Sequence, residues 1–516
     1  MRLMRRYAPF LVLVAAQLLI IAIAPSKAPT TVSAVGSLDK TQEEAAKGRG
    51  IPADGDTSHC VNERQFAELN TAPPCIPKFT GKNPGATFAG VTATEVKIVW
   101  YQAKENPTVT GVLRPLGLAQ SREDERTYLQ AAEEFINDKF ELYGRKVKIE
   151  PFEGQCDYAP PDVPCLRTEA QQIAKSIKPF AVVWATAVGL EFYEELSKAK
   201  VINAGGWHFD DSFNIRNRPY HYDIFMGGSQ QAKLAGEYWC KKLAGKPARY
   251  AGDPNLRAKP RKLGIVTPDL PVNVKSAEEL ARIVRKCDDN GAQISTYAPD
   301  TTRAGEQSIA GTARFKNEGV TTVMFFSDPI GPIFATGAAG RQQYSPEYTM
   351  AGSGLVDYDL LARLYDQKQW ANAFGPSDLP EFTPFEESDT VKVWRAAGRQ
   401  GLPNKANQLG WNYLTFISSG IMGAGPTVNP ENFEQALLTS EPTGGWDKTQ
   451  DPKQVFVEFG KGDYTAVSDA REAYWDAKAV SAIDGKPGAY VSLDGGRRYR
   501  LGEWPTGEPE LPGRPG

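Results

Sequence analysis

Short unbroken apolar runs alternate with segments of helical periodicity over much of the chain. The run at 180–184, FAVVW, is too short for a buried helix and rich in β-branched residues, so it predicts a strand buried on both faces. Small residues follow at 185–189, then apolar positions at helical spacing, and then a second short run at 201–204 that stops at two glycines. This order predicts a strand, a tight turn, a helix and a second, parallel strand.

The same alternation extends on both sides of this unit. Apolar runs predict further strands at 96–101, 147–151, 262–267, 293–297, 320–326 and 348–351. Amphipathic periods predict helices between them, one with Ser121 as its N-cap and others at 230–243, 277–288 and 305–317. Two consecutive sets of strands and helices predict an α/β fold with two doubly wound, Rossmann-like lobes joined by a hinge.

A chain of 516 residues is too long for one hydrophobic core. In chain order we expect a signal peptide or membrane anchor, a linker with a cysteine-clipped loop, two lobes, and a partly irregular C-terminal extension. Their expected bounds are 1–34 for the signal or anchor, 35–93 for the linker, 94–222 plus 350–430 for lobe 1, 223–349 for lobe 2 and 431–516 for the extension.

The amino-terminus has the pattern of an export signal. Arginines at positions 2, 5 and 6 precede an apolar stretch at 8–24, and small residues follow. Val32-Ser33-Ala34 is the best small-x-small site for cleavage. The protein is therefore expected to be exported, either extracellular or on the cell surface. An uncleaved amino-terminal helix that tethers it to the membrane is the alternative left open.

Export makes the six cysteines candidates for disulfide bonds. Local spacing favours two pairs and leaves a third by default: Cys60 with Cys75, Cys156 with Cys165, and Cys240 with Cys287. Sequence alone does not choose among the pairings. With only three histidines and no CxxC pair, the chain offers little material for a zinc site, and we predict no metal.

Motifs of common enzymes are missing from the sequence. No glycine fingerprint for a dinucleotide follows the strand expected at 96–101, and neither a P-loop nor a GxSxG nucleophile motif occurs. A net charge of −3 without a basic block argues against nucleic acid as a partner. We therefore predict a protein that is not an enzyme, needs no cofactor and binds no nucleic acid.

The ends of the expected strands collect small, hydroxyl-bearing and aromatic residues. These residues are Tyr101, Thr186, Gly205, Gly206, Trp207, Thr267, Ser327, Asp328 and Ser353. Ligands of open parallel sheets bind beyond the carboxyl ends of the strands. Backbone N–H groups and the Thr186 hydroxyl would hold a carboxylate, and Asp328 would hold an ammonium group. Two alternatives stay open: Asp328 as part of an Asp-Pro turn, and Trp207 as packing at a sheet edge.

Several motifs follow one another in an order typical of one family. They are VKIVWYQ, AAEEFINDKFELYGRKVKIEPFEGQCD, EAQQIAKSI, FAVVWATAVG, KVINAGGW, YHYDIFMGGSQQAKLAGEYW, KLGIVTPD, GAQISTY and VTTVMFFSD. Over roughly residues 94–370 the series resembles the type I periplasmic substrate-binding proteins of ABC importers, of the branched-chain amino-acid, leucine-binding-like kind. The chain departs from that family in its loop at 104–120, in the turn after Asn203 and in its long carboxyl-terminal part.

This resemblance implies two lobes that cross over near 218–223 and 344–349, with the ligand in a cleft that closes by a hinge motion. It also implies that Thr186 and Ala187 form the ligand carboxylate loop, with further contacts from 205–207, 267–270 and 327–328. We therefore expect an extracellular solute-binding protein that delivers a small polar ligand, an amino acid or similar, to the permease of an ABC importer. The alternatives are a membrane-tethered ligand-sensing ectodomain and a secreted enzyme on the same scaffold.

Overall fold

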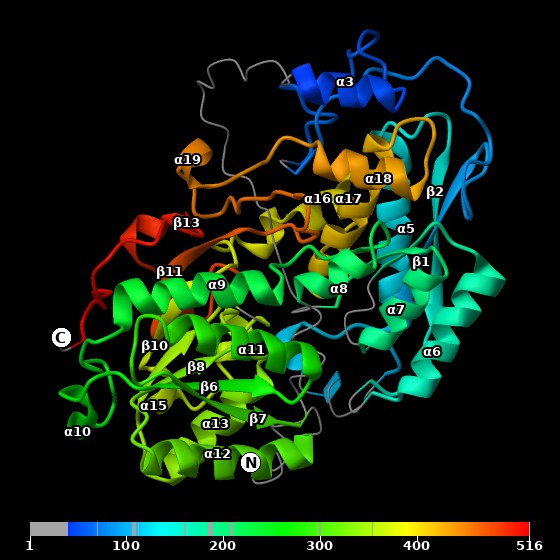
Figure 1. The fold of residues 1–516 in the computed structure, drawn as a ribbon. Coiled ribbons are helices and arrows are strands. Elements are labelled where there is room, and N and C mark those ends of the chain that lie inside the picture. Colours follow the sequence, from blue (N-terminus) through cyan, green and yellow to red (C-terminus); the bar gives the residue numbers. More distant parts are fainter. Residues whose placement is uncertain are drawn as a thin grey trace.

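Figure 1 shows the computed structural model, in which two α/β lobes lie side by side. The structure describes residues 40–514 except 70, 106–109, 112, 159–160, 184–188, 207–209, 299–300 and 353, and it leaves the side chains of 40, 41, 43, 301 and 302 undescribed. The signal peptide or anchor expected at 1–34 lies outside these residues. Within the described ranges no helix is both long and apolar enough to cross a membrane.

The described part of the first lobe is built on a sheet of five parallel strands. They are β1 (Glu95–Gln102), β2 (Lys146–Glu153), β3 (Ala181–Val183), β4 (Ile202–Ala204) and β5 (His221–Tyr222). The strands pair in the order β2-β1-β3-β4-β5. Strands β3 and β4 are buried at every residue, which is why their sequences are continuous apolar runs without alternation.

Helices cover both faces of this sheet. Alternate residues of β1 enter two separate apolar clusters: Ile98 and Trp100 lie with α5, while Val99 and Tyr101 lie with α6 and α7. Ser121 accepts a hydrogen bond from the Asp124 amide and is the predicted N-cap of α5. The helices of this lobe are α5 (Arg122–Lys139), α6 (Val163–Gln172) with its π-helical continuation Ile173–Ile177, α7 (Leu190–Lys198) and α8 (Asp211–Arg216).

The second lobe repeats the same parallel order and adds antiparallel strands. Its parallel strands are β6 (Leu263–Pro268), β7 (Ala292–Tyr297), β8 (Thr322–Phe325), β9 (Glu347–Met350) and β10 (Ala373–Ser377). They pair as β7-β6-β8-β9-β10, which matches the order of the first sheet strand for strand. The two lobes are thus two copies of one doubly wound arrangement, as the alternation of strands and helices predicts.

Helices of the second lobe also form two layers. In Figure 1, α9 and α11 lie on one side of the sheet and α12 and α13 on the other. Their bounds are α9 (Gly228–Tyr238) with its continuation Trp239–Leu243, α10 (Pro254–Arg257), α11 (Pro271–Val284), α12 (Thr301–Asn317), α13 (Ile330–Arg341), α14 (Asp359–Ala362) and α15 (Gln367–Trp370).

The carboxyl-terminal part is more regular than expected. β11 (Asp469–Val480) pairs antiparallel with β10 and also carries β12 (Pro487–Ser492) and β13 (Arg498–Arg500). The extension expected at 431–516 as partly irregular thus contributes three strands that extend the second sheet. The red and orange strands of Figure 1 lie beside that sheet. The pairing joins segments about ninety residues apart, so no local pattern indicates it.

The segment expected to return to the first lobe, 350–430, divides between the lobes. β10 belongs to the second sheet, whereas α16 (Asp389–Ala396) and α17 (Asn407–Gly423) pack on α5. α17 lies directly on β1, because a Cβ at Gly410 would come within 2.6 Å of Trp100. The remaining short helices are α18 (Pro430–Leu438), which packs on α17, and α19 (Trp446–Thr449).

Within the described chain, the backbone passes between the two sheets at 223–227, at 378–388 and at 439–468. The first and third of these segments pair with each other, since the Asp223 amide donates to the Tyr464 carbonyl and the Ala466 amide to the Asp223 carbonyl. The crossing expected at 344–349 is wrong: β9 occupies it and pairs between β8 and β10 inside the second sheet.

Three disulfides confirm the two pairs that the spacing favours and the third pair expected by default. They join Cys60 to Cys75, Cys156 to Cys165, and Cys240 to Cys287. The last of these ties the end of the α9 segment to the end of α11.

The segment expected as a linker at 35–93 packs on the first lobe from its first described helix, α3 (Lys40–Gly48), onward. Phe66 makes an edge contact with Phe135 of α5, at 5.4 Å between ring centroids. Just beyond α3, the Arg49 side chain donates to the Gly423 carbonyl at the end of α17.

Candidate functional site

The strand order that the two sheets share indicates which edge of each sheet could bind a ligand. In both sheets the first strand lies between its two successors, so the connections after β1 and β3, and after β6 and β8, leave in opposite directions. Such a switch point leaves a crevice at the carboxyl ends of the strands, where open α/β sheets bind ligands. The candidate site is therefore built from residues at the ends of β1 and β6 and of their neighbours.

At the end of β1, a polar network surrounds Glu125 in the first turn of α5. Its carboxylate accepts from Trp100 Nε1 at 3.0 Å and from Gln102 Nε2 at 2.5 Å. Arg122 lies 3.4 Å from the same carboxylate and also donates to the Ala103 carbonyl. A buried carboxylate at a helix amino-terminus is favoured by the helix dipole. Sequence reasoning missed Gln102 and Glu125, although a polar residue that ends an apolar run, VKIVWYQ, was a usable signal.

Tyr101, a predicted ligand contact, faces the other side of the sheet from Gln102. Its hydroxyl donates to Glu169 Oε2 at 2.6 Å, and its ring stacks on Phe152. Burial, and then the Glu169 carboxylate, raise the pKa of this hydroxyl above its usual value. The Tyr101 hydroxyl therefore binds Glu169 of α6. Contact between Tyr101 and a ligand stays a prediction.

Two glycines after β4 adopt backbone conformations with positive φ. Gly205 has φ +138° and Gly206 has φ +85°. Gly205 also lies close to Tyr193, whose hydroxyl would be 2.8 Å from a Cβ at this position. A side chain is thus excluded here both by the backbone and by space, as the predicted turn requires. The other predicted contacts of this lobe, Thr186, Ala187 and Trp207, lie outside the described residues, as does Ser353 of the second lobe.

In the second lobe the structure brings Thr267, Ser327 and Asp328 to neighbouring strand ends. β6 and β8 are adjacent, and the Phe326 amide donates to the Val266 carbonyl. The Thr267 side chain is fully buried, and its hydroxyl has no hydrogen-bond partner in the part of the chain that the structure describes. Three of the residues predicted for this lobe therefore share one edge.

Asp328 is half-buried and is already engaged within its own lobe. Its Oδ1 accepts from the Tyr297 hydroxyl at 2.7 Å and from the Ile330 amide at 2.8 Å. Burial raises the pKa of Asp328 to about 6, against the opposing effect of these hydrogen bonds. Asp328 Oδ1 therefore takes part in the turn that leads into α13. This is the role that the alternative interpretation of Asp328, as part of an Asp-Pro turn, gives it.

Two further aspartates, missed by sequence reasoning, follow the next strands of this sheet. Asp357 lies in the loop after β9, and Asp378 directly follows β10. Both are buried, and burial raises the pKa of each. Neither oxygen of Asp357 has a hydrogen-bond partner among the described residues. The carboxyl edge of the second sheet therefore carries aspartates, with Arg471 and Arg498 near Asp357 and Asp378, and the edge of the first carries Glu125 paired with Arg122.

The segments beyond the strand ends of the two lobes meet. Lys275 of α11 donates to Asp210 Oδ1 at 2.8 Å and to the Ser212 hydroxyl at 3.0 Å. Burial works to raise the pKa of Asp210, but hydrogen bonds from Lys275 and Ser212 outweigh it and lower that pKa. Val272, in the first turn of α11, packs against the first-lobe cluster that contains Tyr101. The connection after β4 thus contacts the connection after β6.

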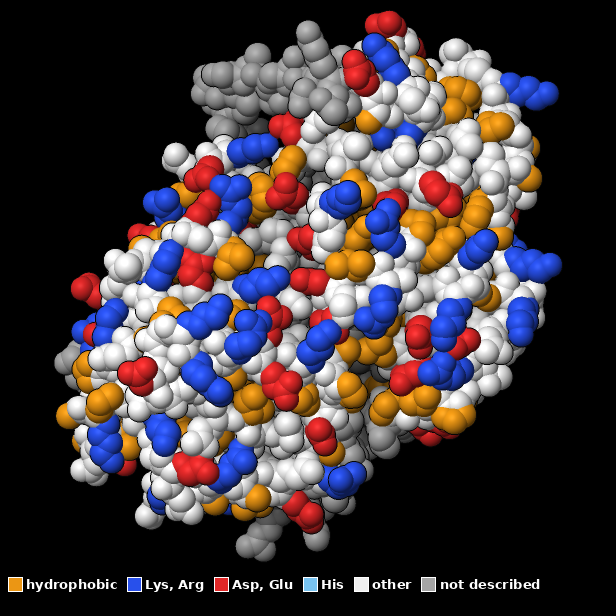
Figure 2. All heavy atoms as spheres, viewed as in Figure 1, with side chains coloured by type: hydrophobic (Ala, Val, Ile, Leu, Met, Phe, Trp, Pro, Cys, Tyr) orange, Lys and Arg blue, Asp and Glu red, His pale blue; other side chains and the backbone are white. Residues whose placement is uncertain are grey.

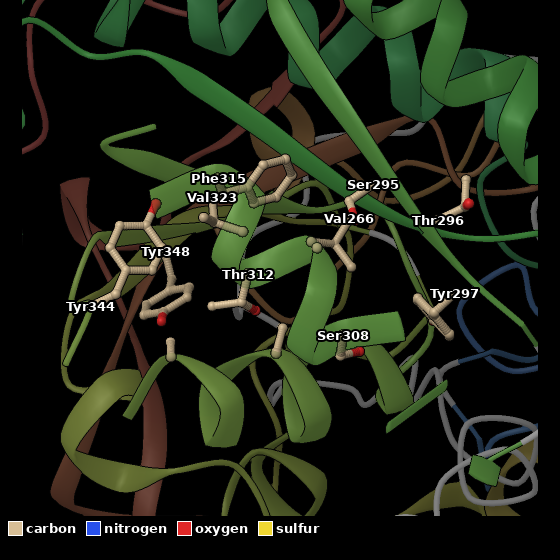
Figure 3. Close-up of a pocket in the computed structure, with 13 residues that line it drawn as sticks. Val266, Ser295, Thr296, Tyr297, Ser308, Thr312, Phe315, Val323, Tyr344 and Tyr348 are labelled. Atoms are coloured by element: carbon tan, nitrogen blue, oxygen red, sulfur yellow. The ribbon is translucent and has the colours of Figure 1, made fainter. Parts of the chain in front are cut away.

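A small cavity lies elsewhere, inside the second lobe between its sheet and helices α12 and α13. Figure 3 shows Tyr344 and Tyr348 on one side of it and Tyr297 on the other. Its volume of about 20 Å³ has room for about one water molecule. Sites for small molecules are of the order of 300 Å³ or more, so this cavity is a packing defect in the lobe rather than a ligand site.

The surface carries mixed charge. On the face shown in Figure 2, Lys and Arg side chains alternate with Asp and Glu side chains over both lobes. This pattern gives no extended field of one sign on that face, so recognition of a charged solute depends on the groups at the strand ends.

Comparison with known proteins gives a consistent structural class. No protein-family model and no curated protein matches the sequence. Among solved structures, a solute-binding protein of an ABC transporter from Rhodopseudomonas palustris HaA2, in complex with p-hydroxybenzoic acid, is similar with a TM-score of 0.54. The two chains are 11% identical, over 79% of this chain and 97% of that one.

Two further solved structures of transporter binding proteins are also similar to this chain. The branched-chain amino acid transporter substrate binding protein LivJ from Streptococcus pneumoniae, in complex with isoleucine, gives a TM-score of 0.50 at 13% identity, over 78% of this chain and 100% of that one. A fatty acid ABC transporter substrate-binding protein from Thermomonospora curvata gives 0.52 at 13% identity, over 82% and 99%. This chain therefore has the fold of the type I periplasmic solute-binding proteins of ABC transporters, and the neighbours are binding proteins rather than enzymes.

Proposed function

We propose that this protein is an exported solute-binding protein that captures a small polar ligand between its lobes and delivers it to the permease of an ABC importer. The observation that carries the proposal is the contact between Asp210 and Lys275, because it joins the connections that follow the carboxyl ends of β4 and β6. The carboxyl edges of two matching sheets therefore lie on either side of one interlobe region.

Carboxylates at the edge of the second lobe favour a ligand with an ammonium group, such as an amino acid. Asp328 and Asp357 give the second lobe candidate acceptors for an ammonium group. Backbone N–H groups and Thr186 remain the predicted partners of a carboxylate in the first lobe. The three crossing segments supply the hinge through which such a ligand would close the lobes.

Ligand binding tests this proposal directly. The exported protein is titrated with amino acids, with 4-hydroxybenzoate and with decanoate, and the thermal midpoint and the heat of binding are measured. A ligand that binds only the folded state stabilises it by about 2.7 kcal/mol at a concentration of 100 times Kd. At least one amino-acid-like compound is expected to raise the midpoint, and Asp328→Asn is expected to weaken its binding about tenfold.

Asp138→Asn serves as the matched control, since Asp138 is an exposed aspartate on α5, on the flank of the first lobe. Failure of every small polar compound to bind or to stabilise the protein would contradict the proposed function. Equal loss of binding in both variants would remove Asp328 from the site and leave the proposed function standing.

A further inference from the structure

The Gln102 side chain is held in one orientation. It ends β1, is fully buried, and its Nε2 donates to Glu125 Oε2 at 2.5 Å. An ionised carboxylate only accepts hydrogen bonds, so the amide nitrogen must face Glu125 and the amide oxygen must face away. That oxygen, Oε1, is buried and finds no hydrogen-bond donor among the described residues.

Glu125 is itself fixed from three sides. Trp100 Nε1 donates to Oε1 of Glu125 at 3.0 Å, Arg122 approaches its other oxygen at 3.4 Å, and the residue lies in the first turn of α5. Trp100 is in turn held under α17, where a Cβ at Gly410 would lie 2.6 Å from its ring. The orientation of Gln102 therefore rests on packed secondary structure rather than on a mobile loop.

An equivalent position in the second lobe shows the same feature. Thr267 lies near the carboxyl end of β6, which has the place in its sheet that β1 has in the first. The Thr267 hydroxyl is also buried without a hydrogen-bond partner in the described chain. A buried polar group without a partner costs about 1–3 kcal/mol, so a ligand that pairs with both atoms would remove that cost at the two switch points.

Given the proposed solute-binding function, we infer that the ligand donates a hydrogen bond to the Gln102 carbonyl oxygen, with Glu125 as the positioning residue and Thr267 as the second polar contact from the opposite lobe. The group that reaches Gln102 is then an ammonium, a hydroxyl or an amide N–H. A hydrocarbon chain would leave Oε1 unsatisfied, and a carboxylate would bring a second acceptor against it. The ligand is thus a donor-bearing polar compound rather than a simple fatty or aromatic acid.

Matched pairs of probes that differ by one donor test this inference. The pairs are isoleucine with 3-methylpentanoate, and 4-hydroxybenzoate with benzoate, each titrated calorimetrically into the full exported chain. In at least one pair the donor-bearing member is expected to bind about tenfold more tightly. Gln102→Met, which removes the acceptor at similar length, is expected to abolish that preference. Thr267→Val is expected to weaken the same probe, and Thr267→Ser, which keeps the hydroxyl, to restore it.

The role of Glu125 has a separate readout. Glu125→Gln can both donate and accept, so the Gln102 amide becomes free to turn over. The ratio of affinities within the pair is then expected to fall several-fold, while Glu125→Asp, which keeps a carboxylate, retains more of it. A role in stability alone would lower the melting temperature of both variants without changing that ratio.

The outcomes separate the two proposals. If no probe binds, the proposed function fails, and the inference fails with it. If both members of each pair bind equally, the solute-binding function stands and the inference is overturned. A structural water on Gln102 predicts unchanged affinities in Gln102→Met, which also overturns it.

Discussion

Buried carboxyl groups at the ends of strands are the feature of this molecule that matters most at the scale of single residues. Asp223, Asp328 and Asp357 each lie where the chain leaves a sheet, and burial raises the pKa of all three. Sequence inspection found Asp328 because it follows a clear apolar run. It missed Asp357, because six residues separate that aspartate from the end of β9 and burial is decided by distant segments.

Asp223, in the first crossing segment, gives a pH-dependent stability with a definite sign. Burial raises the pKa of Asp223 from 3.8 to about 7, although the Phe225 amide and the Tyr413 hydroxyl donate to it. The native state therefore holds a proton that the unfolded chain has released between pH 4 and pH 7. The free energy of unfolding is expected to fall over this range, by about 1.4 kcal/mol for each pKa unit of difference, and to level off above it.

Denaturant unfolding at pH 4.5, 6 and 8 checks this. Relative to the wild-type protein, Asp223→Asn is expected to gain stability as the pH rises through this range, because asparagine does not ionise. The control variant is Asp138→Asn, which removes a carboxyl group that is exposed rather than buried. An Asp223→Asn curve parallel to the wild-type curve at all three pH values would show that Asp223 does not titrate in this way.

At the scale of elements, the antiparallel strands β11 and β12 complete the second sheet and close its edge. β12 is the outer strand, and its Tyr490 amide donates to Asp359 while its Gly488 carbonyl accepts from Arg363. Asp359 lies in α14, and Arg363 is the C-cap of that helix. They satisfy backbone groups that would otherwise template pairing with another chain. The sequence offers no sign of this, since each partner is more than a hundred residues away.

The three disulfides close loops of different length, which predicts a ranking of the stability that each one contributes. Replacing both cysteines of a pair by serine loses the loop-closure contribution, which grows with the length of the closed loop. Loops of 47, 15 and 9 residues correspond to Cys240–Cys287, Cys60–Cys75 and Cys156–Cys165. The expected losses are roughly 4, 3 and 2.6 kcal/mol in that order.

Urea unfolding of the three double variants measures these losses. The order is the test, and the variant of Cys156 and Cys165 is the internal control for a short loop. If that variant were the least stable of the three, the disulfide would act through the native contacts around α6 and not through the unfolded chain.

At the scale of the whole molecule, ion pairs contribute to the contacts between the lobes outside the crossing segments. Lys275 and Asp210 form one of them, and the Lys275 side chain is more than half exposed. An ion pair of this exposure contributes up to about 1 kcal/mol, less at high salt. That is enough to shift an open–closed equilibrium without locking it.

Lys275→Met is therefore expected to favour the open form. Small-angle scattering of the ligand-free variant should give a larger radius of gyration than the wild-type protein, and ligand affinity should fall about two- to fivefold. The control is Lys286→Met, because Lys286 is exposed beyond the end of the same helix. Scattering curves that coincide for Lys275→Met, Lys286→Met and the wild-type protein would contradict a role for this contact in closure.

The sequence by itself determined the two doubly wound lobes and the N-cap at Ser121 and favoured the two short-range disulfide pairs, because each depends on local composition or short spacing. The tertiary structure alone decided which side of β1 faces α5, so that Gln102 rather than Tyr101 has an unsatisfied polar atom at the strand end. It also decided that β11 joins β10 and that Lys275 meets Asp210. These features depend on contacts between residues far apart in the chain, and such contacts leave no periodic trace in the sequence.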